Sequence, residues 1–320
     1  MSIPTDRPYG FDPTYGYGLP GLRAIKPPPA PADFDHFWQA RYGGALRVDP
    51  APRLYQSKSS HPDWHIHDII YTSTDEFQIG GWLLLPREGT VRRGLVVGHG
   101  YGGRDGPDCD IPVEHTAVLF PCFRGLSRSR RPPIASDPAW HVLHDIDRPE
   151  RYILGGCVED VWLGVSVLAG LYPDLAGIGY SGLSFGGGIG ALAIAFDQRI
   201  DRGHLALPTF GNMPLWLSLP TIGSGHAVQN YHKTHPDVLT PLRLFDAATA
   251  ATRIEIPMLV AVARFDPAVA PPCQFSVANA LTASKHHETF ILDAGHSDYP
   301  GSEQQQALLS EKVRQLFRET

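Results

Sequence analysis

The sequence predicts an α/β fold: a mostly parallel, doubly wound sheet with helices on both faces and an N-terminal extension. Two short runs that are apolar almost throughout, 94–100 and 117–120, are typical of parallel strands buried on both sides. An apolar stripe at helical spacing then covers 157–171, and an apolar run at 176–181 leads into a glycine-rich helix at 186–196. This order of strand, helix, strand and helix predicts the doubly wound sheet.

The segment before these strands predicts an antiparallel start to the sheet. Runs 65–71 and 77–85 have strand-like patterns, with Gly80-Gly81 marking a bulge or turn in the second run and Pro86 ending it. A short amphipathic helix at 33–42, capped by its first residue, is expected upstream.

The remaining segments indicate one domain with an insertion. Proline lacks an amide N–H, so the proline-rich stretch 26–31 cannot form a regular helix, and residues 1–32 are expected to form an extended arm. Residues 33–320 are expected to form a single domain, because the chain has no internal repeat. Within it, 210–254 is irregular and aromatic-rich, and we interpret it as a cap over the carboxyl edge of the sheet. Two strands and a closing helix are predicted at 258–263, 288–292 and 303–318.

Composition and charge narrow the class of protein. The 320 residues are 42% hydrophobic and 19% charged, which is typical of a compact globular chain. A net charge of −6 without a basic block disfavours nucleic acid as a partner. The sequence has neither an uncharged apolar run of about 18 residues nor a basic-then-apolar start, so no membrane span or signal peptide is expected. Four scattered cysteines favour a reducing, cytoplasmic location, and without a Cys-x-x-Cys pair structural zinc has no support.

A candidate nucleophile lies between the 176–181 run and the helix that follows it. Residues 182–186, Gly-Leu-Ser-Phe-Gly, fit the Gly-x-Ser-x-Gly pattern, in which a serine sits on a strained strand-to-helix turn between small residues. The helix start also brings free N–H groups close to the hydroxyl. The pentapeptide alone also occurs in ordinary turns. Ser184 is assigned as the nucleophile because a predicted strand precedes it and a predicted helix follows it. Ser181, the nearest competitor, lacks the flanking glycines.

A serine nucleophile of this kind requires an acid and then a histidine further along the chain. Asp266 follows the apolar run 258–263, and His296 follows the next predicted strand, so both are expected in loops that leave the carboxyl ends of strands. Asp293 is an alternative acid, although it lies only three residues before His296. The pair 286–287, His-His, precedes a strand and would lie at the wrong edge of the sheet.

Two backbone N–H groups are predicted to stabilise the oxyanion. One belongs to Phe185, the residue after the serine, and the other to Tyr101 in the glycine-rich loop 99–103. His99 precedes the serine in the chain, and we interpret it as a structural ligand of that loop rather than as a base. The His-x-His pair at 65–67 is explained by alternation along a strand, so no metal site is predicted.

Several longer segments are shared with a known family. They are the stretches 31–38, 80–86, 99–103, 244–247, 253–257 and 265–272. Through them the chain resembles the acetyl xylan esterase and cephalosporin C deacetylase family of carbohydrate esterases, within the α/β-hydrolase superfamily. The resemblance spans most of the chain, and the stretch around Asp266 is its most specific part.

The resemblance implies a catalytic triad and a substrate class. The triad would be Ser184, Asp266 and His296, with the oxyanion hole at the N–H groups of Tyr101 and Phe185. The substrate would be a small acylated molecule, a sugar or related alcohol carrying acetyl or another short acyl group, and no cofactor is needed. The resemblance also implies a homo-oligomer, often a hexamer whose sites face an internal cavity.

Three positions depart from the family pattern. The family's Arg-Gly-Gln is here Arg-Gly-Leu at 124–126, and the glutamine after the nucleophile is Phe185. The glutamate after the histidine is Ser297. These changes leave the triad intact and mark a divergent member, whose substrate range they affect.

The sequence thus predicts a cofactor-free serine carboxylesterase that works through an acyl-enzyme. Tyr101, Phe185, Pro208 and Trp216 are the candidate substrate contacts, with core packing as the alternative for Trp216. Two other functions stay open: hydrolysis of a different acyl, lactone or amide substrate, and a non-catalytic protein that kept the fold.

Overall fold

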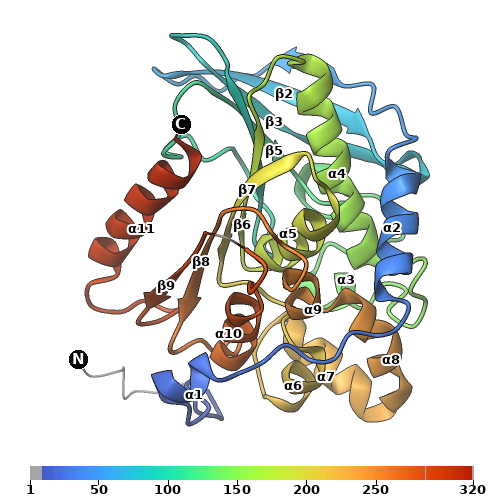
Figure 1. Cartoon of the computed structure of the whole chain (residues 1–320). Helices are drawn as coiled ribbons and strands as arrows, with labels where there is room; N and C mark the ends of the chain where they lie inside the picture. The colour runs from blue at the N-terminus through green and yellow to red at the C-terminus, as the bar shows by residue number, and fades with distance from the viewer. Residues whose placement is uncertain (1–8, 285, 319–320) are drawn as a thin grey trace.

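A nine-stranded sheet runs through the part of the chain that the computed structural model describes, residues 9–284 and 286–318 (Figure 1). The strands follow the order β1-β2-β3-β5-β4-β6-β7-β8-β9. Their bounds are β1 Arg53–Gln56, β2 Trp64–Thr72, β3 Gln78–Pro86, β4 Arg93–Gly98, β5 Thr116–Pro121, β6 Ile178–Leu183, β7 Ile200–Ala206, β8 Met258–Ala263 and β9 His287–Leu292.

The sheet has an antiparallel start and a parallel body. β1, β2 and β3 pair antiparallel, and so do β3 and β5, whereas every pairing from β5 through β4, β6, β7 and β8 to β9 is parallel. The residues of β5 and β8 are buried throughout, as expected for strands covered on both faces. The predicted doubly wound α/β fold is confirmed.

Helices cover both faces of this sheet (Figure 1). One face packs against α4 Ile153–Leu171 and α5 Phe185–Phe196, with α2 Phe34–Ala45 outside them. The other face packs against α11 Ser302–Phe317, whose Leu309, Val313 and Phe317 join its apolar core. Among the described residues, α4 alone is long and apolar enough to cross a membrane, but 83% of its apolar window is buried inside the fold, as in a core helix.

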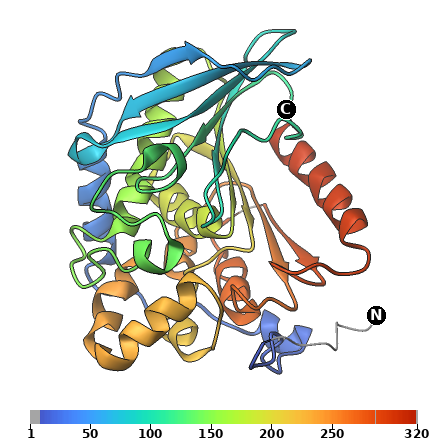
Figure 2. The same ribbon diagram turned by 180° about the vertical axis from the view of Figure 1, so that it is seen from behind.

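The segment 210–254, predicted as a cap, folds into short helices. Figures 1 and 2 show them at the end of the sheet where β8 leads into α10 Pro271–Asn279. The helices are α6 Met213–Ser218, α7 Ser224–Thr234, α8 Leu239–Leu242 and α9 Ala247–Ala251. A fifth short helix, α3 Pro138–His141, packs against α7. Single 3-10 turns occur at Thr74–Glu76, Ser127–Ser129, Pro236–Val238 and Arg243–Phe245.

The N-terminal stretch differs in part from the expected extended arm. The prediction covered residues 1–32, of which residues 1–8 lie outside the described part of the chain. A short helix, α1 Leu19–Arg23, interrupts the stretch, and 24–31 contains no helix or strand. The stretch is fastened along its length, because Asn279 Nδ2 donates to the carbonyl oxygens of Leu22 and Ile25 and Arg243 Nη2 donates to that of Pro29.

Local patterns misjudged two features of the sheet and one helix end. Gly80 and Gly81 form neither bulge nor turn but pair in regular register within β3. The neighbouring backbone explains the choice of glycine: a Cβ at Gly81 would overlap the carbonyl oxygen of Phe120 and lie 3.0 Å from Cα of Pro121. The sequence pattern also does not predict β7, which lies between β6 and β8, because polar residues interrupt its apolar run. Asp33 stands at the N-cap of α2, but its side chain makes no capping hydrogen bond.

We predict that Gly81→Ala destabilises the protein, because the added methyl group must push β3 away from β5. The expected loss in the free energy of unfolding is about 1–3 kcal/mol, the usual cost of overpacking, measured by chemical denaturation. Gly170→Ala is the matched control, since nothing lies within 4 Å of a Cβ at that exposed position in α4. It should be neutral or stabilise by up to about 1 kcal/mol. Wild-type stability in Gly81→Ala would contradict the close approach.

Candidate active site

Ser184 occupies the sharp turn between β6 and α5. β6 ends at Leu183 and α5 begins at Phe185, which leaves Ser184 between them with φ 54° and ψ −108°. A non-glycine residue adopts such angles only where its surroundings hold it there. Two backbone hydrogen bonds do so: Ser184 N–H donates to Ala206 O at 2.7 Å, and Thr209 N–H donates to Ser184 O at 3.2 Å.

Small residues allow the first turn of α5 to approach two strands closely. A Cβ at Gly186 would lie 2.7 Å from the carbonyl carbon of Gly98 and 2.9 Å from the oxygen of His99. A Cβ at Gly187 would lie 3.0 Å from the oxygen of Ala206. The glycines that follow the serine therefore permit this packing, as the motif predicts.

The structure brings Ser184, Asp266 and His296 together in one hydrogen-bonded line. His296 Nε2 lies 3.0 Å from Ser184 Oγ, and His296 Nδ1 lies 2.8 Å from Asp266 Oδ2. Asp266 stands in the loop after β8, and His296 stands in the loop after β9 with φ 47°. Because β8 and β9 are parallel neighbours, their carboxyl ends bring the two loops to the same edge of the sheet.

The competing residues lie elsewhere. The Asp293 carboxylate faces the Arg264 guanidinium at 4.0 Å rather than His296. Ser181 lies within β6, and its hydroxyl is 3.0 Å from His204 Nδ1. His287 opens β9, at the edge opposite His296.

Asp266 is fully buried and receives four hydrogen bonds. The backbone N–H groups of Ala268 and Val269 donate to Oδ1 at 2.9 Å, while Gln274 Nε2 donates to Oδ2 at 2.8 Å beside His296. Buried polar atoms need hydrogen-bond partners, and both carboxylate oxygens of Asp266 have them. The carboxylate is therefore a fixed acceptor that holds the imidazole in one orientation.

The sequence pattern does not predict a role for Gln274. It lies on α10, is fully buried, and its amide oxygen accepts a hydrogen bond from the backbone N–H of Ala263 at 2.8 Å. The side chain thus bridges the end of β8 to the acid. A polar residue inside an otherwise apolar stretch, eight positions after the predicted acid, was the available signal.

The protonation of His296 follows from its two neighbours. A carboxylate only accepts hydrogen bonds, so Nδ1–H donates to Asp266, and in the neutral ring Nε2 accepts from Ser184 Oγ–H. Burial lowers the pKa of His296, but the hydrogen bond and the negative charge of Asp266 outweigh it, and the pKa is raised above 6.5. The side chain keeps 27% of its surface exposed, so the ring is also within reach of solvent.

The two predicted oxyanion donors belong to the first turn of α5 and to the loop after β4. Phe185 is the first residue of α5, where helical N–H groups lack a partner within the helix. Tyr101 belongs to the loop that His99 fastens: His99 Nδ1–H donates to Gly100 O at 2.7 Å, and Nε2 accepts from Phe123 N–H at 3.0 Å. Burial and the nearby charge of Arg104 lower the pKa of His99 to about 3, so it stays neutral, in a structural role.

An aromatic stack fixes the Tyr101 side chain. Its ring stacks on the Phe185 ring with centroids 4.0 Å apart, and its Oη lies 3.0 Å from His141 Nδ1. His141 Nε2–H donates to the carbonyl oxygen of Arg124 at 2.8 Å, so Nδ1 is the acceptor and Tyr101 the donor. Burial lowers the pKa of His141 to about 4, which keeps this arrangement intact near neutral pH.

Three of the four predicted substrate contacts need correction, because their side chains are buried. Phe185 is fully buried and Trp216 is only 1% exposed, so both rings pack in the core and offer no surface to a ligand. For Trp216 the alternative of core packing holds. Pro208 is buried beside the first turn of α5, and Tyr101 is partly exposed.

The structure shows the contacts of the residues at and beside the positions that depart from the family pattern. Arg124 keeps a structural role, because its guanidinium is buried and pairs with Asp160 at 2.7 Å. Leu126 is also buried. Ser297 Oγ, next to the catalytic histidine candidate, lies 3.4 Å from Tyr9 Oη.

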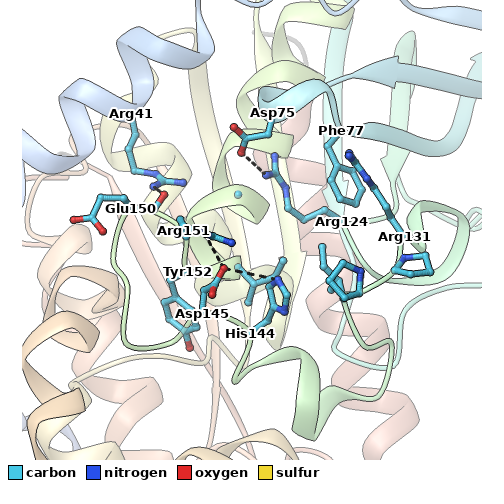
Figure 3. A pocket seen from close by; sticks show the side chains of 15 residues that line it. Arg41, Asp75, Phe77, Arg124, Arg131, His144, Asp145, Glu150, Arg151 and Tyr152 are labelled. Carbon is cyan, nitrogen blue, oxygen red and sulfur yellow. Dashed lines mark hydrogen bonds and ion pairs between the residues drawn. The ribbon is translucent and has the colours of Figure 1, made fainter.

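A cavity of about 700 Å³ beside α2 and α4 contains none of the predicted site residues (Figure 3). Four arginines line it, but three of them pair with acids. Arg41 pairs with Glu159 at 2.9 Å, Arg124 with Asp160 and Arg151 with Asp145 at 3.1 Å. The cavity is therefore nearly neutral. Within the described residues, no group of three or more His, Cys, Asp or Glu side chains is placed to hold a metal ion.

Solved structures with the same fold include two acetyl xylan esterases. The enzyme from a Thermoanaerobacterium species matches with a TM-score of 0.78 and 19% identity over 95% of this chain and 99% of that one. The enzyme from a Paenibacillus species matches with a TM-score of 0.77 and 21% identity over 92% and 99%. An esterase from Pyrococcus furiosus matches with a TM-score of 0.58 and 16% identity over 84% and 98%.

A match between the amino-acid sequence and a family model shows the family of this chain. A model of the acetyl xylan esterase family matches residues 21–312, which is most of the chain. The chain therefore belongs to the acetyl xylan esterase family, and it is a carboxylic ester hydrolase with the α/β-hydrolase fold.

Proposed function

We propose that this protein removes acetyl and other short acyl groups from sugars or related alcohols through an acyl-enzyme at Ser184. One observation carries the proposal: Asp266, His296 and Ser184 form a continuous hydrogen-bonded line at a strained strand-to-helix turn. Membership of the acetyl xylan esterase family supplies the substrate class.

The first half of the reaction forms the acyl-enzyme. Ser184 Oγ attacks the ester carbonyl carbon while its proton passes to His296 Nε2. The carbonyl electrons move onto the oxygen, which the N–H groups of Tyr101 and Phe185 stabilise as an oxyanion. When the carbonyl re-forms, the C–O bond to the alcohol breaks and His296 gives its proton to the departing oxygen. Asp266 stabilises the imidazolium between these steps.

The second half repeats the sequence with water. His296 takes a proton from water as the water oxygen attacks the acyl carbon, and it returns the proton to Ser184 Oγ when the acid leaves. The buried Asp266, held by donors on both oxygens, keeps the imidazole in the orientation that both halves need. The proposed reaction uses five groups of the protein: the serine, the acid, the histidine and the two backbone donors.

Organisation and location belong to the same proposal. We assign residues 1–32 as an arm, 33–320 as one domain and 210–254 as its cap, supported by the short helices of that segment at the carboxyl edge. A cytoplasmic location is supported by the four cysteines, which are all free thiols. Assembly into a homo-oligomer such as a hexamer and deacetylation of cephalosporin C rest on the resemblance alone.

Acyl-chain preference tests the substrate assignment. We expect kcat/KM to be highest for acetyl in a p-nitrophenyl ester series from acetyl to octanoyl. Ser184→Ala should lower kcat by about 10⁴-fold or more, because the nucleophile is lost. Ser181→Ala is the matched control and should keep activity, since its hydroxyl faces His204. Preference for long chains would redirect the proposal to another acyl substrate, and activity retained in Ser184→Ala would overturn it.

The pH profile tests the role of His296. The imidazole must be neutral to accept the serine proton, so kcat/KM should fall as pH drops through the His296 pKa, with a midpoint above 6.5. Because Asp266 raises this pKa, the residual activity of Asp266→Asn should show its midpoint at lower pH. Asp293→Asn is the control and should leave the midpoint in place. A flat wild-type profile between about pH 5 and 8 would contradict the assignment.

A further inference from the structure

Residues 9–17 lie against both loops that carry the acid and the base. Asp266 N–H donates to the carbonyl oxygen of Pro13 at 3.1 Å, and Tyr9 Oη lies 3.4 Å from Ser297 Oγ. Tyr15 Oη donates to the carbonyl oxygen of Pro220, between α6 and α7, at 2.7 Å. This segment precedes residue 21, where the family match begins, so it is a feature of this chain beyond the matched region.

The segment carries a row of aromatic rings, which we call the aromatic row: Tyr9, Phe11 and Tyr15. The ring centroids of Tyr9 and Phe11 are 6.0 Å apart, and those of Phe11 and Tyr15 are 5.7 Å apart. All three residues are half-buried, so each packs against its neighbours and keeps part of its surface accessible.

A short turn holds the aromatic row in shape. Thr14 N–H donates to Asp12 Oδ1 at 3.0 Å, and Tyr15 N–H donates to the carbonyl oxygen of Asp12 at 2.8 Å. Pro13, within this turn, is buried against the acid loop. The row is thus preorganised, and a ligand would not have to order it.

The direction of the reaction determines which part of an ester would meet the aromatic row. In the proposed mechanism His296 protonates the departing alcohol, so the alcohol leaves on the side of the histidine loop. Ser297 follows His296 in that loop and faces Tyr9. The alcohol portion therefore departs toward the aromatic row, while the acyl group lies toward the oxyanion donors.

We propose that the aromatic row forms one wall of the alcohol subsite and binds a sugar ring by its face. Aromatic faces carry partial negative charge and attract the C–H groups of a sugar ring, while hydroxyl groups such as Tyr9 Oη and Ser297 Oγ offer polar contacts. This inference rests on the proposed function, because it assigns the binding of that reaction's leaving group. It makes Phe11, at the centre of the row, a specificity-determining residue.

The test compares acetyl esters of two different alcohols. Tetra-O-acetyl-xylose carries a sugar ring, whereas ethyl acetate has too small an alcohol to reach the row. Phe11→Ala should lower kcat/KM for the acetylated xylose by about tenfold through KM, with ethyl acetate unchanged within about twofold. Phe11→Trp should retain wild-type kcat/KM on the sugar ester, because it restores an aromatic face.

The control is Tyr55→Ala, which removes a half-exposed aromatic ring from β1. It should leave kcat/KM unchanged for both esters. Equal losses on both esters through kcat would mean that the segment only supports the catalytic loops, and would overturn the inference. Unchanged kinetics in Phe11→Ala, or no wild-type action on the sugar ester, would also overturn it. Failure of the proposed function is distinct: Ser184→Ala would then still hydrolyse ethyl acetate.

Discussion

The structure depends on how closely the first turn of α5 approaches the backbones of β4 and β7. Gly186 packs against Gly98 and His99 with no room for a side chain, and Gly187 packs tightly against the carbonyl of Ala206. This contact ties the helix to the centre of the sheet and leaves the residue before it, Ser184, with a positive φ. The strain at that one residue is offset by packing and backbone hydrogen bonds around it, so the hydroxyl stands clear of the sheet.

The sheet brings the other groups of the site to the same edge as Ser184. The carboxyl ends of β8 and β9 bring the loops of Asp266 and His296 to the edge at which Ser184 turns. Gln274 and the backbone of Pro13 then hold the acid loop from two sides, one from α10 and one from the N-terminal segment. A buried, fully hydrogen-bonded carboxylate raises the pKa of the histidine, which connects the packing of the loops to the proposed proton transfer.

Much of this arrangement was predictable from local pattern, and the rest was not. The parallel sheet, the turn at Ser184 and the two loop residues follow from apolar runs and glycine spacing, which are short-range signals. Gln274 and His141 act through contacts with residues that sequence spacing does not pair with them, and a single sequence carries no such information. The Phe185 ring was misassigned for a related reason: the motif specifies its backbone N–H, while its side chain direction depends on Tyr101 and Phe123 around it.

Covalent labelling shows whether Ser184 is the activated serine. An organophosphorus fluoride reacts with serines that a neighbouring base activates, and peptide mass spectrometry identifies the residue modified. We predict one phosphoryl adduct, on Ser184, formed more slowly as pH falls below the His296 pKa and absent from Ser184→Ala. An adduct on another serine, or none on a protein that hydrolyses acetyl esters, would contradict it.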